Sequence, residues 1–301
     1  MIEYEPRLVE EAVLLALRDH AEEGVFRAAR DRLYEIPDAE ARDAAFRRLH
    51  VAWFERLGLA RPIQRALGEQ PLIGGETRTC VVAYAASSRQ EGAELFVRPP
   101  GDGGSEAERR AVVVRLRPHM LLTPTRLLEL LRHELLHIRD MLDPRFGYGP
   151  RLPAPEGGAG FGPLMKDRYR VLWDAYVDGR LARLGRARSG VRADRLDEFR
   201  RAFPMLGERT EELFDRFFTV APLRHAELVA FALEPGASGG GPRAGRCPLC
   251  GFPTHAFEPE PGRLPRAVRE QIRSDFPEWD AAAGLCLQCA DLYRSRSPSL
   301  A

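Results

Sequence analysis

Residues 133–144 read HELLHIRDMLDP, and this stretch holds two histidines four residues apart with a glutamate directly after the first. Side chains four residues apart on an α-helix lie on one face, one turn above each other. His133 and His137 can therefore direct their imidazole rings at one metal ion. Glu134 would lie beside them, outside the set of ligands, where its carboxylate can act as a general base.

The segments before this stretch predict a small sheet followed by a long helix. Apolar and β-branched residues gather in three runs separated by polar or glycine-rich residues, namely TCVVAYAAS (79–87), AELFVRP (93–99) and AVVVRLRP (111–118). Thr123 and Pro124 then supply a helix cap and a first-turn proline, and the helical pattern continues until Pro144. The HELLH residues are thus expected inside a helix that follows a strand.

A strand followed by an HELLH helix resembles the core of the zincin metallopeptidases, over about residues 77–180 of this chain. The resemblance implies an α+β fold with a zincin-like catalytic domain, a catalytic zinc ion, and hydrolysis of peptide bonds with Glu134 as general base. It also implies that AVVVRLRP is the edge strand of the sheet, along which an extended peptide substrate would lie.

A catalytic zinc ion needs a third protein ligand. Two of the candidates for it, Asp143 and His225, are weak. Asp143 lies six residues beyond His137, but no glycine breaks the helix between them, so Asp143 is expected at the helix end. His225 could supply a ligand, as a downstream histidine does in SprT-like proteases, or could donate a proton to the transition state. It could equally be a core or surface histidine.

The remaining candidates are Asp174 and Asp178 in WDAYVDGRL, which share one face of a predicted helix. This pair resembles the gluzincin arrangement, in which a later helix carries an acidic zinc ligand and, one turn on, an acid that holds a ligand histidine. By that resemblance Asp174 is the ligand and Asp178 orients a histidine. The reverse assignment stays open, as does the alternative that both acids lie on a solvated helix face and pair with Arg170 or Arg180.

Two CxxC pairs near the end of the chain predict a second metal site, made of Cys247, Cys250, Cys286 and Cys289. Four thiolates form a closed, structural zinc site, so the segment is similar to a zinc ribbon. The gap between the pairs is long, and we expect the residues within it to pack on the ribbon. Cys80 stands apart in a strand-like run and is expected to be a buried apolar residue.

The chain has 301 residues, of which 44% are hydrophobic, and this length predicts several domains. The predicted parts are a helical N-terminal region (1–72), a zincin-like domain (73–234), a linker (235–246) and the ribbon (247–301). Lys and Arg total 45 against 44 Asp and Glu, so the overall charge gives no attraction to nucleic acid or anionic membranes. The N-terminus lacks the features of a signal peptide, which favours a cytoplasmic location.

These features favour a zinc-dependent metallopeptidase that acts on a peptide or protein, with one catalytic and one structural Zn²⁺. The ribbon or the N-terminal helices could also bind a protein partner. Two alternatives remain open. One is a SprT-like protease that acts on DNA-bound proteins, although charges in the ribbon are nearly balanced. The other is a non-catalytic scaffold protein, in which both metal sites stabilise the fold and no reaction is catalysed.

Overall fold

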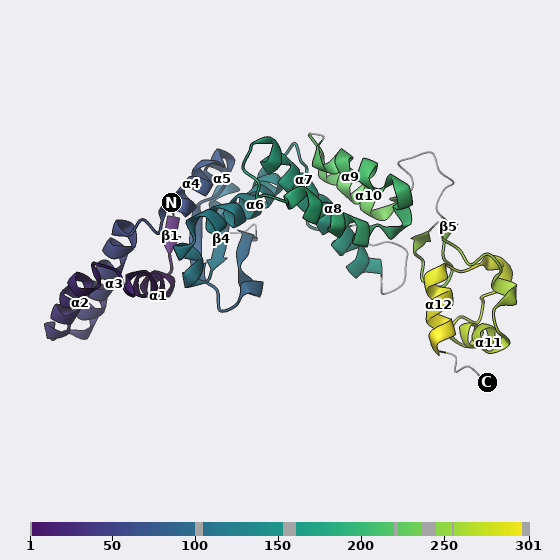
Figure 1. The fold of residues 1–301 in the computed structure, drawn as a ribbon, viewed down its shortest axis with the longest axis horizontal. Coiled ribbons are helices and arrows are strands. Elements are labelled where there is room, and N and C mark those ends of the chain that lie inside the picture. The colour runs from purple at the N-terminus through teal and green to yellow at the C-terminus, as the bar shows by residue number, and fades with distance from the viewer. Residues whose placement is uncertain are drawn as a thin grey trace. The chain divides into compact units, whose positions relative to one another are not determined.

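The computed structural model describes residues 2–99, 105–152, 161–219, 222–235, 245–254 and 256–296. The chain divides into two compact units, Met1–Tyr148 and Gly149–Ala301, whose elements are labelled in Figure 1. Both helices and a mixed sheet are present, so the prediction of the α+β class is confirmed. The predicted linker lies almost wholly outside the described residues, and the predicted domain boundaries stay predictions. In the described part of the chain, no helix is both long and apolar enough to cross a bilayer.

The first unit contains a four-stranded sheet in the order β1-β2-β4-β3, made of β1 (Ile2–Tyr4), β2 (Thr79–Tyr84), β4 (Arg110–Leu116) and β3 (Gly92–Val97). β1 and β4 run parallel to β2, whereas β3 runs antiparallel to β4. The three predicted strands are confirmed. The prediction that residues 111–118 form the edge strand is wrong, because β4 is paired on both sides and β3 forms that edge.

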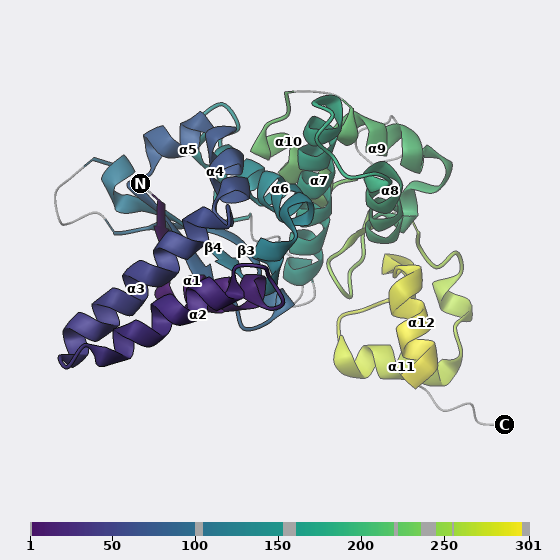
Figure 2. The ribbon, with the colours of Figure 1, turned by 60° about the vertical axis from the view of Figure 1, so that its left-hand side comes forward.

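The described residues of the first unit form the helices α1 (Pro6–Leu17), α2 (Glu23–Asp31), α3 (Ala39–Arg56), α4 (Arg61–Gly68), α5 (Pro71–Glu76) and α6 (Pro124–Leu142). Figure 2 shows α2 and α3 running alongside each other. Asp38 caps α3 by accepting a hydrogen bond from the backbone N–H of Ala41 at 2.7 Å. The helix predicted between Pro124 and Pro144 is confirmed as α6, and it carries the HELLH residues.

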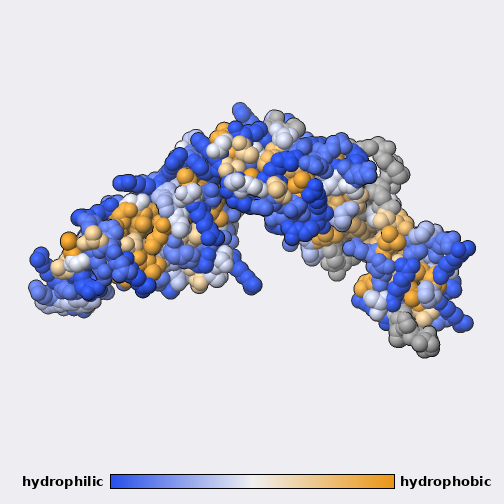
Figure 3. All heavy atoms as spheres, in the orientation of Figure 1, coloured by the Kyte–Doolittle hydropathy of each residue, from blue (hydrophilic) through white to orange (hydrophobic). Residues whose placement is uncertain are grey.

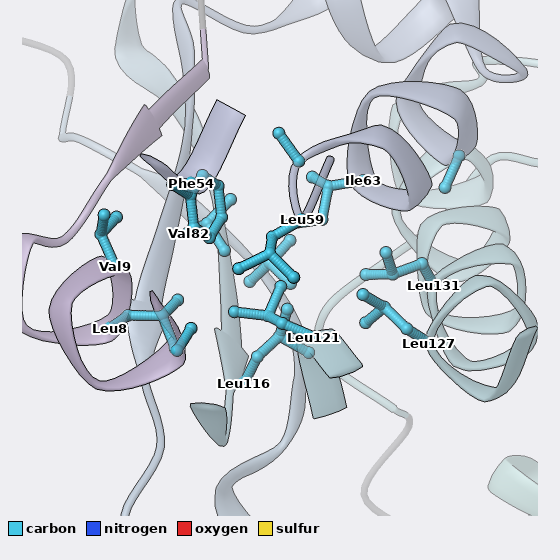
Figure 4. Packing of buried hydrophobic residues seen from close by; sticks show 14 of the residues in the cluster. Leu8, Val9, Phe54, Leu59, Ile63, Val82, Leu116, Leu121, Leu127 and Leu131 are labelled. Atoms are coloured by element: carbon cyan, nitrogen blue, oxygen red, sulfur yellow. The ribbon is translucent and has the colours of Figure 1, made fainter. Parts of the chain in front are cut away.

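A single apolar core joins the N-terminal helices to the sheet and to α6 (Figure 4). Its members include Leu8 of α1, Ile63 of α4, Val82 of β2, Leu116 of β4 and Leu131 of α6, each at most 1% exposed. Burying a side chain of this size stabilises a fold by about 1.5–3 kcal/mol. Because leucines fix one face of α6 in this core, the rotation of the helix is set, and with it the direction of the two histidines.

The part of the second unit that precedes the cysteine segment contains the described helices α7 (Phe161–Arg183), α8 (Val191–Ala202), α9 (Thr210–Phe218) and α10 (His225–Leu233). Phenylalanine rings fill the space between α8, α9 and α10, with Phe199 and Phe217 fully buried. Gly179 allows α7 to approach α9 closely, since a Cβ atom there would collide with the backbone of Phe218. The helix predicted around Asp174 and Asp178 is confirmed as α7.

Candidate metal centres

The two histidines of α6 converge as the sequence predicts. Nε2 of His133 and Nε2 of His137 lie 3.2 Å apart. Two nitrogens that each bind zinc at 2.0–2.1 Å in a tetrahedral arrangement are separated by about 3.3 Å. The same separation also permits a hydrogen bond from one ring N–H to the other nitrogen. The spacing therefore fits a shared metal ion without requiring one.

Glu134 points to the edge of the sheet rather than into the core. Its Oε2 accepts a hydrogen bond from the backbone N–H of Ala93, on β3, at 3.1 Å. Gly92, the residue before, has φ +151°, and a Cβ atom there would lie 3.2 Å from the same oxygen. Glu134 also lines a cleft of about 610 Å³ beside Tyr84 and Arg115. The candidate general base is thus held at an open site next to an edge strand.

Asp174 and Asp178 are buried on α7, with exposed fractions of 7% and 5%. Oδ2 of Asp174 accepts hydrogen bonds from Arg170 at 2.9 Å and from Arg195 at 3.4 Å. Oδ2 of Asp178 accepts one from Nε of Arg195 at 2.6 Å. The predicted pairing of Asp174 with Arg170 is thus found, but both acids are buried rather than on a solvated face, and Arg195 was not among the predicted partners. This pairing supplies the charge that lets two carboxylates stay buried one turn apart.

Two groups of side chains in the described part of the chain can hold a metal ion. One is His133, His137 and Asp174, each of which offers a ligand atom within 4.8 Å of the others. Two imidazole nitrogens and one carboxylate oxygen form the donor set of many catalytic zinc sites. Asp178 is not in this group.

Asp143 and His225, the other two residues considered for this site, form hydrogen bonds elsewhere. Asp143 directly follows α6, and its Oδ1 accepts a hydrogen bond from the backbone N–H of Arg145 at 2.9 Å, so its predicted role at the helix end is confirmed. His225 begins α10, is 9% exposed, and its Nδ1 lies 2.7 Å from the hydroxyl of Tyr169. Burial lowers the pKa of His225, so the neutral imidazole is favoured. The proposed contribution of His225 to the transition state stays a prediction.

The four cysteines form the second group, as predicted. Sγ of Cys247 lies 3.9 Å from Sγ of Cys289, and Sγ of Cys250 lies 3.9 Å from Sγ of Cys286. Four sulfurs bound tetrahedrally to zinc at 2.3 Å are separated by about 3.8 Å. The sulfurs are therefore near enough, and suitably spaced, to bind one metal ion.

Local backbone geometry shapes this cysteine cluster. Gly251 has φ +69°, and its N–H donates to the carbonyl of Cys247 at 2.7 Å, which closes a tight turn. The N–H of Cys286 donates to Sγ of Cys247 at 3.3 Å. Hydrogen bonds from the neighbouring thiols, above all Cys250, lower the pKa of Cys247. These hydrogen bonds favour the thiolate form of Cys247, which is the form in which cysteine binds a metal.

The residues between the two cysteine pairs pack on the cluster, which confirms the expectation for this long insert. They include α11 (Arg266–Asp275), and α12 (Leu287–Arg296) follows Cys286. Val268, Ile272 and Trp279 share an apolar core with three of the cysteines. Cys80, by contrast, is buried in β2, and burial raises its pKa to about 11, so it is an apolar core residue as predicted.

Comparison of the chain with protein-family models, with curated proteins and with solved structures finds no match. Any function for the protein must therefore be inferred from the geometry of the two candidate metal sites. Three residues of this geometry were not predicted from the sequence. Ala93 donates to Glu134 from a strand distant in sequence, Gly92 precedes it in that strand, and Arg195 binds both acids from a different helix, so no local sequence pattern marks them.

Proposed function

We propose that the protein is a zinc-dependent metallopeptidase in which His133, His137 and Asp174 bind the catalytic zinc and Glu134 is the general base. The main support is the 3.2 Å separation of the two Nε2 atoms, which suits ligands of one zinc ion. Three protein ligands would leave one position open, as catalytic rather than structural zinc sites do. The four-cysteine cluster would hold the second, structural zinc, in a ribbon-like module.

Zinc in such a site makes a bound water more acidic and polarises a carbonyl group. Glu134 would remove a proton from the attacking water and deliver it to the leaving nitrogen of the peptide. The N–H of Ala93 holds Oε2 of Glu134 at 3.1 Å and would keep the carboxylate oriented for both transfers. Arg170 and Arg195 would fix the carboxylate of Asp174 in the same way.

The substrate we propose is an extended peptide that pairs with the edge strand β3. Among the described strands, β3 pairs with β4 alone, so backbone groups along its other side, apart from the N–H of Ala93 that Glu134 holds, can accept a peptide. The cleft that contains Glu134 is lined by Gly92, Ala93 and Glu94 from the start of this strand. A peptide bond laid along β3 would thus pass close to the general base.

Metal counting combined with a proteolysis assay tests this proposal. We expect two zinc ions per chain, cleavage of a denatured protein such as reduced casein, and loss of cleavage by at least about a hundredfold in Glu134→Gln with both zinc ions retained. Full cleavage by Glu134→Gln would refute the proposed mechanism. Two zinc ions without any cleavage would favour the scaffold alternative, and salt-dependent retention on DNA would favour the SprT-like alternative.

A further inference from the structure

The cleft beside the proposed general base is bordered mainly by polar and charged side chains. Its charged residues are Arg89, Glu91, Glu94, Arg115 and Glu134. Figure 3 shows an apolar patch of the first unit over its N-terminal helices, and none of the cleft residues belongs to those helices. Selection of a substrate by charge therefore suits this cleft better than selection by apolar contact.

Two ion pairs balance most of the charges at the cleft. Oε2 of Glu94 accepts a hydrogen bond from Arg115 at 2.5 Å. Oε2 of Glu91 accepts one from the side chain of Arg117 at 2.8 Å, and its Oε1 accepts another from the backbone N–H of Arg117 at 3.2 Å. The side chain of Glu91 is only 9% exposed, so this second pair also fixes the loop between β2 and β3 to the end of β4.

Arg89 differs from the other charged residues of the cleft. Among those in the described part of the chain, it alone forms neither an ion pair nor a side-chain hydrogen bond. It lies in the short 3₁₀ turn η2 (Ser88–Gln90) and is exposed. Oε1 of Gln90 accepts a hydrogen bond from the backbone N–H of Ala86 at 2.8 Å, which holds this turn in place. The loop thus presents a cationic group to the cleft without a carboxylate of the protein to neutralise it.

We propose that Arg89 makes the peptidase select substrates with an acidic side chain close to the bond that is cleaved. This inference rests on the proposed function, because Arg89 and Glu134 line the same cleft of about 610 Å³. A guanidinium can form two parallel hydrogen bonds with a carboxylate. A round cavity of this volume is about 10 Å across, the length of about three residues of an extended peptide. The acidic residue should therefore lie within about three residues of the cleaved bond.

The expected preference is modest, because Arg89 is exposed. A single ion pair at such a site changes an equilibrium by up to about fivefold, so a peptide with Glu should be preferred to one with Gln by about that factor. Lys at the same position would be repelled, which should widen the difference to about tenfold. The preference should also fade at about 1 M salt, since screening then acts over about 3 Å.

Fluorogenic peptides with one neutral host sequence test the proposal on the zinc-loaded full chain. Each peptide carries Glu, Gln or Lys at one of the three positions on either side of the cleaved bond. At one position at least, kcat/KM should follow the order Glu, Gln, Lys, with the factors given above. Equal cleavage of the three peptides at every position would overturn the inference and leave the proposed function intact.

Arg89→Glu should reverse the order of the Glu and Lys peptides, an effect that simple loosening of the turn would not produce. Arg98→Ala is the matched control and should keep the wild-type order. Arg98 is also an exposed arginine, directly after β3, but it does not line the cleft. Wild-type preference retained in Arg89→Glu would overturn the proposal.

Binding measured without cleavage separates this inference from the proposed function. Fluorescence anisotropy of labelled peptides with the zinc-loaded Glu134→Gln variant should show the same order of affinities, Glu before Gln before Lys. If the wild type cleaves no peptide but this order is found, Arg89 remains a recognition residue and the proposed function fails. Equal affinities for the three peptides would overturn the role of Arg89, whatever the outcome of proteolysis.

Discussion

The backbone N–H of Ala93 donates to Oε2 of Glu134 across 3.1 Å, and this bond connects the edge strand β3 to the helix that carries both histidines. The strand that we propose as the substrate platform therefore also holds the proposed general base. A change at the start of β3 should alter catalysis without removing any metal ligand.

Gly92→Ala should lower proteolysis by about tenfold while leaving zinc content unchanged. The added Cβ would lie 3.2 Å from Oε2 of Glu134, and φ at this residue is +151°, which disfavours a side chain. The measurement is kcat/KM on a fluorogenic peptide together with zinc per chain. Gly74→Ala serves as the control, because a Cβ at Gly74 meets nothing within 4 Å, and it should retain full activity.

Asp174→Ala should reduce the zinc content from two ions per chain to about one and abolish proteolysis, since the carboxylate is a proposed ligand. Asp178→Ala should keep most of the zinc, because its carboxylate contacts Arg195 and is not in the metal-binding group. Atomic absorption after dialysis measures the zinc content of both variants. The reverse outcome, with zinc lost only in Asp178→Ala, would assign the two acids the opposite way.

Cys289→Ser should unfold the C-terminal module while leaving the first unit folded. Metal binding to four cysteines supplies about 10–16 kcal/mol of folding free energy in small zinc modules, and the apolar core here is small. Limited proteolysis should release the segment after residue 245 from this variant, and a strong chelator should do the same to the wild type. A module that stays protected after metal removal would contradict the structural role.

Glu69→Gln should lower the free energy of unfolding of the first unit by about 3 kcal/mol. Glu69 accepts two hydrogen bonds from Arg132, at 2.8 and 2.7 Å, and the two side chains are only 12% and 10% exposed. Removing one partner leaves a buried guanidinium without its counter-charge. Urea titration followed by circular dichroism measures the change.

Arg65→Ala is the matched control for this ion pair. Arg65 also contacts Glu69, at 3.4 Å, but its side chain is 66% exposed, so its loss should cost less than about 1 kcal/mol. Equal effects of the two variants would mean that the Arg132 contact contributes no more than a surface ion pair.

The sequence alone predicted the features that depend on local geometry. The helical repeat places His133 and His137 on one face whatever the rest of the fold, and each CxxC pair brings two sulfurs together within a single turn. Helix α6, three of the four strands in the main sheet and the packing of the long insert were also predicted correctly, because apolar periodicity reports burial.

Only the tertiary structure decided which strand lies at the sheet edge and what surrounds each acid. β4 is an inner strand because β2 and β3 pair with its two sides, and strand pairing depends on residues distant in sequence. The contacts of Arg195 with Asp174 and Asp178, and of Ala93 with Glu134, also join residues distant in sequence, because Arg195 lies on α8 and Ala93 on β3. Periodicity along a chain records which side of an element is buried, but not which partner buries it.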